Sequence, residues 1–370
     1  MATIRVQLPG GGPAGSPDRS YDIVCGSGLL EGVGRLLAAA GARRAVVITD
    51  AAVADTHAAS VADALRAAGV ELAMLTVPSG EGSKSPASAA RLWAELARLA
   101  VDRATHVVAV GGGVVGDLAG FVAATFARGL PVWQVPTTLV AQVDSAIGGK
   151  TGINLDEGKN LVGAFWQPRG VVADIATLAT LPQREFVSGL AEVVKYGMIL
   201  DTEFFGWLET HAPAVLARRP DELAHAVERS AALKARVVEQ DELEISGLRA
   251  ALNYGHTFGH AYETAAGYGR LLHGEAVAIG MARAARLAEI LGRIPAEVVA
   301  RQDALLGRFG LPTSPRAAGP IAADTLLEIM GRDKKALGGR LRFVLPDRIG
   351  RVELVGDIDP RVVTQVLAAD

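Results

Sequence analysis

The sequence has one cysteine, few aromatic side chains and almost no net charge. Cys25 is the only cysteine in 370 residues, so neither an internal disulfide nor a thiolate metal cluster can form within the chain. A lone cysteine is typical of proteins in a reducing compartment, so we expect a cytoplasmic protein. Cys25 lies in a strand-like YDIVC run, which favours a small buried apolar group over a nucleophile.

The chain also lacks a surplus of charge and a long hydrophobic run. Its 37 Lys and Arg residues stand against 40 Asp and Glu, a formal charge of −3, whereas nucleic-acid and membrane-surface binders usually carry a basic surplus. No stretch approaches the ~20 apolar residues of a membrane span. The opening residues, MATIRVQLPGGG, lack the basic and apolar regions of a secretory signal. We expect neither a nucleic-acid nor a membrane partner.

The pattern of apolar residues changes along the chain, whose length predicts about two domains. Up to about residue 183, short β-branched runs alternate with helical segments, which predicts a parallel sheet with helices on both faces. Beyond it the pattern is mainly helical. We predict an α/β domain over 1–183 and a mainly helical domain over 184–370. The predicted strands are 44–49, 71–77, 106–110, 131–135 and 170–175, the helices include 53–68, 86–100, 184–200, 202–217, 221–240, 249–265, 274–291 and 295–308, and a late hairpin joins 341–346 to 351–355.

Three of the seven histidines lie close together, in NYGHTFGHAYETAAGYGRLLHGE (253–275). His256 and His260 are four residues apart, which places both imidazoles on one face of a helix. His273 begins the next helical segment. Imidazoles combined with a carboxylate suit zinc, although the same three residues could be ordinary core or surface histidines. Tyr254, within the same stretch, reads as a packing residue.

A carboxylate for such a site could come from the predicted helix SGLAEVVKYG (188–197). Glu192 and Lys195 lie three residues apart beside its apolar face. They could form an exposed ion pair, which stabilises a helix by only about 0.2–0.5 kcal/mol. Alternatively, Glu192 completes a zinc site with two histidines. Spacing alone does not decide between these interpretations.

Two glycine-rich segments are candidates for binding anions. GGGVVGD (111–117) follows a predicted strand and matches G-x-G-x-x-G, which predicts dinucleotide binding or simply a tight turn, with Asp117 at a helix start. The acidic residue expected about twenty positions later is missing. In VDSAIGGKTG (143–152), Asp144 stands where a P-loop requires glycine. Lys150, Lys159 and Asn160 are therefore predicted on glycine-rich loops, either around an anion or solvated.

These motifs, taken in order, resemble the 3-dehydroquinate synthase family over nearly the whole chain. The matching blocks are GGGVVGDLAGFVAATFARG, QVPTTLVAQVDSAIGGKTGIN, GKNLVGAFWQP, TLPQREFVSGLAEVVKYG, NYGHTFGHAYE and HGEAVAIGM. The resemblance implies an NAD-binding domain, a helical metal-binding domain, an active site in the cleft between them, and usually a homodimer. One departure is the segment between Lys234 and Arg249, which is one residue longer than is common and has Leu243 where an arginine is frequent.

The resemblance also implies roles for individual residues. The implied metal ligands, for zinc or alternatively cobalt, are Glu192, His256 and His273. The implied NAD-binding residues are Glu81, Lys84, Gly113, Val114, Val115, Gly116, Asp117, Thr137, Thr138, Lys150, Lys159, Thr177 and Thr180. The implied substrate-binding residues are Arg128 (from a partner subunit), Lys150, Asn160, Lys195, Lys234, Arg249, Asn253, His260 and one of Lys334 and Lys335. The implied catalytic residues are Asp144, Lys150, Asn160, Lys195 and His260.

The activity implied by the family is a lyase reaction of the shikimate pathway, on the way to chorismate and the aromatic amino acids. It converts 3-deoxy-D-arabino-heptulosonate 7-phosphate into 3-dehydroquinate and phosphate. Three alternatives stay open: a cyclase of another sugar 7-phosphate, an amino-dehydroquinate synthase, and a metal-dependent polyol dehydrogenase. Arg249, Leu252 and Asn253 favour dehydroquinate formation, because substrates of the other cyclases lack the carboxylate that an arginine would bind.

Overall fold

The computed structural model describes residues 1–8, 10, 18–267, 269–332 and 341–368. The chain forms two compact units. Unit 1 consists of Met1–Leu181 and Leu223–Leu243, and unit 2 of Pro182–Glu222 and Glu244–Asp370. The predicted division would keep residues 223–243 with the helical domain, whereas their contacts place them in unit 1. There Lys234 donates to Asp144, and the Gln7 amide donates to Glu239 at 2.7 Å.

Unit 1 is built on a seven-stranded sheet in which every neighbouring pair is parallel except β1 with β2. The parallel sheet of an α/β domain is thus confirmed, with one antiparallel edge strand. In spatial order the strands are β1 (Ala2–Val6), β2 (Tyr21–Gly26), β9 (Gly170–Asp174), β6 (Val132–Pro136), β5 (His106–Gly111), β3 (Arg44–Asp50) and β4 (Glu71–Val77).

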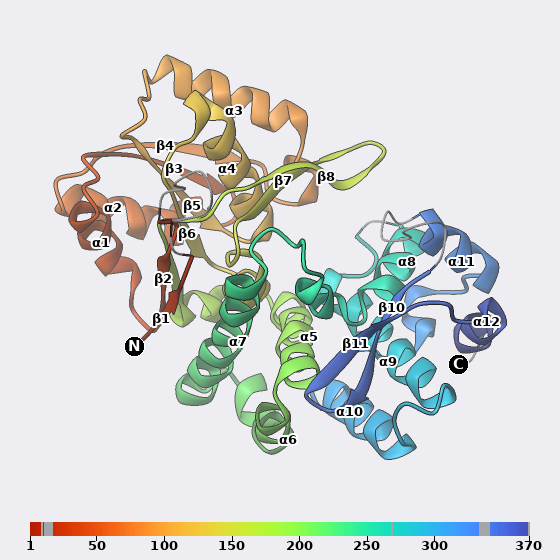
Figure 1. Ribbon diagram of the computed structural model, residues 1–370. Coiled ribbons are helices and arrows are strands. Elements are labelled where there is room, and N and C mark those ends of the chain that lie inside the picture. The colour runs from red at the N-terminus through yellow and green to blue at the C-terminus, as the bar shows by residue number, and fades with distance from the viewer. Residues whose placement is uncertain (9, 11–17, 268, 333–340, 369–370) are drawn as a thin grey trace. The chain divides into compact units, whose positions relative to one another are not determined.

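Helices cover both faces of this sheet (Figure 1). Successive side chains of a strand point to opposite faces, and the two cores of unit 1 follow this alternation on β3. Val46 packs with Leu92 and Leu118, whereas Val47 packs with Leu37 and Leu65. The helices on the first face are α3 (Pro86–Arg98) and α4 (Gly113–Thr125), those on the second are α1 (Val33–Ala39) and α2 (Ala59–Ala67), and α7 (Pro220–Gln240) contributes most of its length to unit 1.

The strand order creates a ligand-binding position in unit 1. β3 pairs with β4 on one side and with β5 on the other, so the chain changes direction across the sheet between β3 and β5. In open α/β sheets, ligands bind outside the carboxyl ends of the strands at such a switch point. The glycine-rich segment 111–117 follows β5 at this position.

The segment that carries Lys150, Lys159 and Asn160 is a hairpin, so its prediction as glycine-rich loops is wrong. β7 (Lys150–Leu155) and β8 (Gly158–Phe165) pair antiparallel. Their glycines serve close strand contact: a Cβ on Gly152 would lie 2.7 Å from the Val162 carbonyl oxygen. The glycines that suggested a loop therefore belong to a tightly packed ladder.

Unit 2 is mainly helical, as predicted. The predicted helix 249–265 is interrupted, because Gly255 adopts φ +79° and separates a 3₁₀ turn, Leu248–Asn253, from α8. None of the helices that the structure describes is long and apolar enough to cross a membrane. The helices are α5 (Gln183–Leu200), α6 (Thr202–Leu216), α8 (His256–Ala266), α9 (His273–Ile290), α10 (Ala296–Arg308), α11 (Ala323–Arg332) and α12 (Pro360–Ala368), and the predicted late hairpin is β10 (Phe343–Arg348) with β11 (Arg351–Val355).

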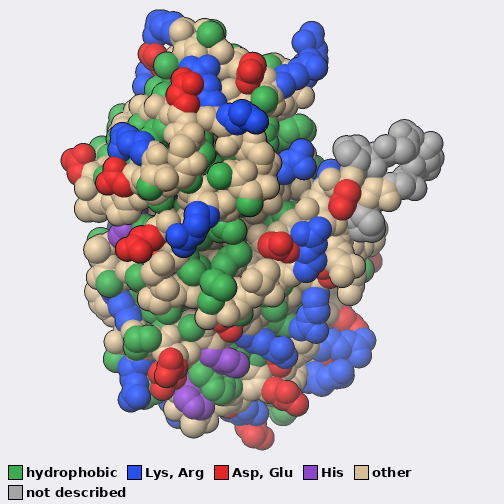
Figure 2. All heavy atoms as spheres, turned by 90° about the vertical axis from the view of Figure 1, so that its left-hand side faces the viewer, with side chains coloured by type: hydrophobic (Ala, Val, Ile, Leu, Met, Phe, Trp, Pro, Cys, Tyr) green, Lys and Arg blue, Asp and Glu red, His purple; other side chains and the backbone are tan. Residues whose placement is uncertain are grey.

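The surface carries charges of both signs. On the face that Figure 2 shows, Lys and Arg side chains are interspersed with Asp and Glu. This mixture agrees with the near balance of charges in the sequence.

Candidate functional site

Glu192 is a carboxylate enclosed in the interior of unit 2. Helix α5 is buried from Ser188 to Ile199, and Glu192 itself is 0 % exposed. Burying an ionised carboxylate is unfavourable unless cations or hydrogen-bond donors compensate for its lost hydration. The exposed ion pair considered for Glu192 and Lys195 is therefore wrong, since Lys195 is also only 1 % exposed.

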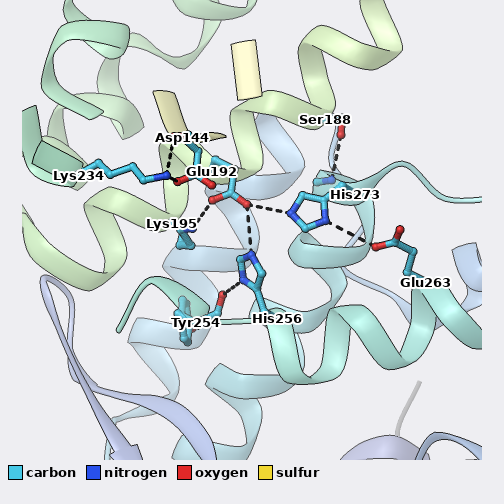
Figure 3. A network of polar contacts seen from close by, with 10 residues as sticks. Asp144, Ser188, Glu192, Lys195, Lys234, Tyr254, His256, Glu263 and His273 are labelled. Carbon is cyan, nitrogen blue, oxygen red and sulfur yellow. Dashed lines mark hydrogen bonds and ion pairs between the residues drawn. The ribbon is translucent and has the colours of Figure 1, made fainter. Parts of the chain in front are cut away.

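Two histidines, each the first residue of its helix, converge on Glu192 (Figure 3). The Nε2 atom of His256 lies 3.7 Å from Glu192 Oε1, and Nε2 of His273 lies 3.5 Å from the same oxygen. One ligand atom from each of the three residues lies within 4.8 Å of the others. Helix α5 and the starts of two helices much later in the chain thus bring together the donor set of a tetrahedral zinc site with one open position.

Neighbouring groups hold both imidazoles with Nε2 directed at Glu192. His256 Nδ1 lies 3.1 Å from the Tyr254 carbonyl oxygen and donates its hydrogen there. His273 Nδ1 lies 3.6 Å from a Glu263 oxygen, and the Gly274 amide donates to Ser188 Oγ at 3.0 Å. Such partners fix the tautomer and orientation of metal-binding histidines. We did not predict them from the sequence, although Glu263 lies one helical turn after His260 and so could be placed on the same face.

The charged groups of this cluster shift one another's pKa values. Burial raises the pKa of Glu192, but the Lys195 ammonium, which forms an ion pair with it, and the two imidazoles together lower that pKa well below its ordinary value. Burial and the Lys195 charge lower the pKa of His256 well below its ordinary value. For His273, burial is outweighed by the carboxylates of Glu192 and Glu263, which raise its pKa to about 9. The carboxylate is therefore ionised and His256 neutral, the forms that bind a metal, whereas His273 would have to release a proton on binding one.

The residues present fit a divalent metal ion. Both Glu192 oxygens are buried, and neither accepts a hydrogen bond of ordinary geometry from the described part of the chain. Buried oxygens of this kind are usually satisfied by a partner, and an ion would provide one. His260 lies beside this set, its ring centroid 5.4 Å from that of His256 and 6.1 Å from that of His273.

The other predicted residues of unit 2 lie on two elements. Lys195 is one turn after Glu192 on α5, and Arg249 and Asn253 lie in the 3₁₀ turn before α8. Arg249 is buried, with 2 % of its surface exposed, whereas Asn253 is half-buried. Lys334 and Lys335 lie outside the described residues.

The predicted nucleotide-binding residues of unit 1 follow the carboxyl ends of four parallel strands. One correction concerns Asp117: α4 begins at Gly113, so Asp117 lies in the second turn and not at the helix start. Gly112 packs closely against the segment after β6, since a Cβ there would lie 3.0 Å from Thr138 Cγ2. Glu81 and Lys84 follow β4, the segment Gly113–Asp117 with Val114, Val115 and Gly116 follows β5, Thr137 and Thr138 follow β6, and Thr177 and Thr180 follow β9.

Lys84 connects two of these segments with the hairpin. Its Nζ donates to Asp117 Oδ2 at 2.5 Å and to Asn160 Oδ1. Lys84 is 5 % exposed, so its charge is compensated by Asp117 within the protein. Burial raises the pKa of Asp117 more than the Lys84 charge lowers it. Asn154 completes the link, since its side chain donates to Glu81 at 2.7 Å and accepts from the Asn160 amide at 3.0 Å.

A second ion pair joins α7 to the segment before the hairpin. Lys234 Nζ donates to Asp144 Oδ1 and to the Asp144 carbonyl oxygen, both at 2.5 Å. This contact unites two residues that the sequence analysis assigned to different domains. Lys150, Asn160 and Arg128 are exposed, and Lys159 is half-buried.

Gln142 holds the strand ends in place, and we did not predict it. It is 0 % exposed, and its Nε2 lies 3.2 Å from the Pro136 carbonyl oxygen, 2.9 Å from that of Asp174 and 3.1 Å from Thr177 Oγ1. It therefore ties β6 to β9 where Thr137 and Thr177 follow. A single glutamine between apolar residues has no sequence pattern that marks this role.

Comparisons with known proteins cover nearly the whole chain. The family model described as 3-dehydroquinate synthase N-terminal matches residues 74–188, and the one described as 3-dehydroquinate synthase C-terminal matches residues 189–336. The 3-dehydroquinate synthase of Rhodopirellula baltica is 49 % identical over 359 residues, which is 95 % of each chain. That of Pelobacter propionicus is 51 % identical over 334 residues, covering 90 % of this chain and 92 % of the other.

Solved structures of cyclases have the same fold. A 2-deoxy-scyllo-inosose synthase complexed with carbaglucose-6-phosphate, NAD+ and Co2+ has a TM-score of 0.87 and 27 % identity, with 99 % of each chain covered. The 2-epi-5-epi-valiolone synthase ValA from Streptomyces hygroscopicus, with NAD+ and Zn2+ bound, has a TM-score of 0.85 and 28 % identity, covering 94 % of this chain and 95 % of the other.

Proposed function

Because the chain belongs to the 3-dehydroquinate synthase family, we propose that it converts 3-deoxy-D-arabino-heptulosonate 7-phosphate into 3-dehydroquinate and inorganic phosphate. Curated relatives with this activity in their names are 46 to 51 % identical to it. The observation that supports the proposal most directly is the convergence of His256 and His273 on the buried carboxylate of Glu192, which accepts no hydrogen bond of ordinary geometry from the described residues.

The proposed cofactors are NAD+ and one divalent ion, zinc or alternatively cobalt. The solved cyclases that resemble this chain contain NAD+ with Co2+ or Zn2+. When bound, NAD+ would supply reversible hydride transfer at substrate carbon 5, and the ion would supply Lewis-acid polarisation of the oxygen on that carbon. Glu192, His256 and His273 would hold the ion. The residues that follow β4, β5, β6 and β9 would hold the nucleotide.

The proposed reaction leaves the cofactor unchanged overall. Oxidation of the C5 alcohol to a ketone acidifies the C6–H bond. Loss of that proton, which the family is thought to pass to the substrate's own phosphate, allows inorganic phosphate to leave. Return of the hydride restores the C5 alcohol, the ring then opens, and the enolate attacks the ketone in an intramolecular aldol closure. The work of the protein is to hold charges and conformers in place.

The chain's own residues would bind the two anionic groups of this substrate. We propose that Arg249 binds the planar carboxylate, since a guanidinium can donate two parallel hydrogen bonds to it. Lys150 and Asn160, exposed on the β7–β8 hairpin, are proposed for the phosphate side together with Lys159.

Within unit 2, Lys195 and His260 are proposed to act on the substrate itself. Lys195 contacts Glu192, so a metal that takes over the carboxylate leaves the ammonium able to donate to substrate oxygens. His260 lies beside the metal ligands without belonging to the set, which suits a hydrogen-bonding and proton-relay group. Asn160 is proposed for the same kind of role, and the Asp144–Lys234 pair for the support of the substrate groups.

The test is a reaction with purified protein, NAD+, Zn2+ and the heptulosonate phosphate. We expect stoichiometric phosphate release, 3-dehydroquinate as the product by NMR, and no net accumulation of NADH. A chelator should abolish the reaction, and Zn2+ or Co2+ should restore it. NADH that accumulates, or a cyclic product other than 3-dehydroquinate, would overturn the proposal; the first would indicate a dehydrogenase and the second another cyclase.

We also propose that the protein is a cytoplasmic homodimer in which Arg128 serves the partner's substrate. Arg128 is exposed and adopts φ +67°, directly after Ala127 at φ +50°. Two consecutive non-glycine residues in the left-handed region are strained, and such strain is often retained at functional positions. Light scattering should give twice the mass of one chain, and Arg128→Ala should raise the KM for the substrate. A monomer with full activity would contradict this proposal.

A further inference from the structure

Tyr254 is fixed at both its backbone and its side chain, next to a proposed metal ligand. It is 0 % exposed. Its carbonyl oxygen accepts the hydrogen of His256 Nδ1 at 3.1 Å, as Figure 3 shows. Its hydroxyl donates to Gln302 Oε1 at 2.5 Å, on α10. Tyr254 therefore joins the His256 imidazole, at the start of α8, to α10.

Gln302 extends this connection to α9, the helix that begins with the ligand His273. Gln302 is also 0 % exposed, and its Nε2 donates to the Met281 carbonyl oxygen at 3.1 Å. The Tyr254 hydroxyl lies 3.3 Å from the same oxygen.

The backbone beside Tyr254 packs directly against α9. A Cβ on Gly280 would lie 1.9 Å from the Gly255 carbonyl oxygen, and a Cβ on Gly255 would lie 2.9 Å from the Met281 amide nitrogen. The segment around Gly255 and helix α9 can come this close because Gly255 and Gly280 both lack a side chain. Main chain on one side and the Gln302 hydrogen bond on the other thus determine where the Tyr254 carbonyl points.

We propose that Tyr254 and Gln302 are positioning residues for the metal ligand His256, which they hold in the tautomer and orientation that direct Nε2 at the ion. The inference rests on the proposed function in one respect, that Glu192, His256 and His273 bind a divalent ion. The reading of Tyr254 as a packing residue is replaced by this role. A packing role would require only the ring, whereas positioning requires the hydroxyl and its acceptor.

Substitutions separate these two roles. Tyr254→Phe keeps the ring and removes the hydroxyl, and Gln302→Leu removes the acceptor. Tyr254→Phe leaves Gln302 Oε1 without its donor, and Gln302→Leu leaves the Tyr254 hydroxyl only its longer contact to the Met281 carbonyl oxygen. Both changes destabilise the fold, whereas removing both partners together can be nearly neutral for stability. The double variant should therefore regain stability but not the orientation of His256.

The experiment measures affinity for Co2+ by competition with a chelator, together with unfolding of the metal-free protein. We expect both single variants and the double variant to bind Co2+ on the order of 10-fold more weakly than the unsubstituted protein, the lower range for loss of an outer-shell partner. The visible spectrum of bound Co2+, which reports ligand geometry, should change in all three. If the double variant recovers affinity along with stability, or if Tyr254→Phe binds as the unsubstituted protein does, the proposal is overturned.

Tyr262→Phe is the matched control. Tyr262 lies on α8, the helix that begins with His256, is 2 % exposed, and its hydroxyl has no hydrogen-bond partner in the described part of the chain. This variant should bind Co2+ as tightly as the unsubstituted protein, and a tenfold loss here would refute a specific role for Tyr254. Failure of the metal site itself is recognised separately, because the unsubstituted protein would then bind no Co2+.

Discussion

The two units hold their buried charges in different ways. In unit 1, each buried lysine meets a carboxylate: Lys84 donates to Asp117 and Lys234 to Asp144, each at 2.5 Å. In unit 2, one carboxylate, Glu192, faces Lys195 and two imidazoles at once. Neither of its oxygens accepts an ordinary hydrogen bond from the described residues.

This difference indicates where a bound ion is needed. The lysines of unit 1 are already compensated by carboxylates, so those pairs can form without a ligand. The Glu192 carboxylate of unit 2 has cationic and neutral donors around it but accepts no hydrogen bond of ordinary geometry from the described residues. A buried ion pair that only stabilises the fold would have such hydrogen bonds. The donor set suits a divalent metal ion. The comparison predicts that unit 2 depends on a metal and that unit 1 does not.

The largest effect is expected from Glu192→Gln, which removes the charge and keeps the shape. The protein should lose its bound metal, and kcat/KM should fall by about 10³-fold or more, because a Lewis-acid metal contributes several kcal/mol. Metal content by elemental analysis and the rate of phosphate release are the measurements. The control is Glu185→Gln on the exposed part of the same helix, where both should be unchanged. Full metal content in Glu192→Gln would refute the site.

A smaller effect is expected from Lys195→Met. The ammonium is not a metal ligand, and its removal leaves Glu192, His256 and His273 in place. We expect the metal to stay bound while kcat falls about 100-fold, the range for loss of one proton-transfer or hydrogen-bonding group. Loss of the metal together with the activity would show that Lys195 maintains the site and does not act on the substrate.

In unit 1, Lys84→Met should weaken NAD+ binding without changing the metal content. It leaves Asp117 without its cation in a partly buried place, and breaking such a pair is strongly destabilising. We expect NAD+ to bind about 10-fold more weakly, a change of about 1.4 kcal/mol, measured by calorimetry. The double variant Lys84→Met with Asp117→Asn should recover stability. A fall in the metal content of Lys84→Met would contradict the prediction that only unit 2 depends on the metal.

The smallest effect concerns Cys25 in the apolar core of unit 1, which carries no proposed function. Burial raises the pKa of its thiol from 9.0 to about 12. Between these values the unfolded chain loses the proton and the folded chain keeps it, so this group makes stability fall as pH rises from 9 to 12. Cys25→Ala should therefore lose less stability than the unsubstituted protein over this interval. The free energy of unfolding is measured by denaturant titration at several pH values. If it falls with pH equally in both proteins, burial does not raise the pKa of the Cys25 thiol.

The sequence predicted the elements of the fold better than their partners. Hydrophobic periodicity located the strands β3 to β6 and the helices α5 to α10 to within a few residues, apart from the break at Gly255. It could not assign α7 to a unit, because an amphipathic pattern shows that a face is buried but not against what. The glycine-rich motif also suggested a loop at Gly152, since a glycine needed for close strand contact looks the same in the sequence as one in a turn.

The metal site, too, was predicted only in part from the sequence. The spacing of His256 and His273 indicated a possible metal site, because both lie at helix starts in one short stretch of the sequence. Glu192 could not be joined to them by spacing, since only the packing of α5 against α9 brings it there, and the family resemblance had to supply it. Tyr254, Gln302 and Gln142 were missed because their roles depend on contacts between elements that no local pattern records.

The most direct test is anomalous diffraction at the zinc absorption edge from crystals grown with Zn2+. The account predicts one strong peak, about 2.0–2.2 Å from a Glu192 oxygen and from Nε2 of His256 and His273. A peak bound by other residues, or none beside these three side chains, would contradict it.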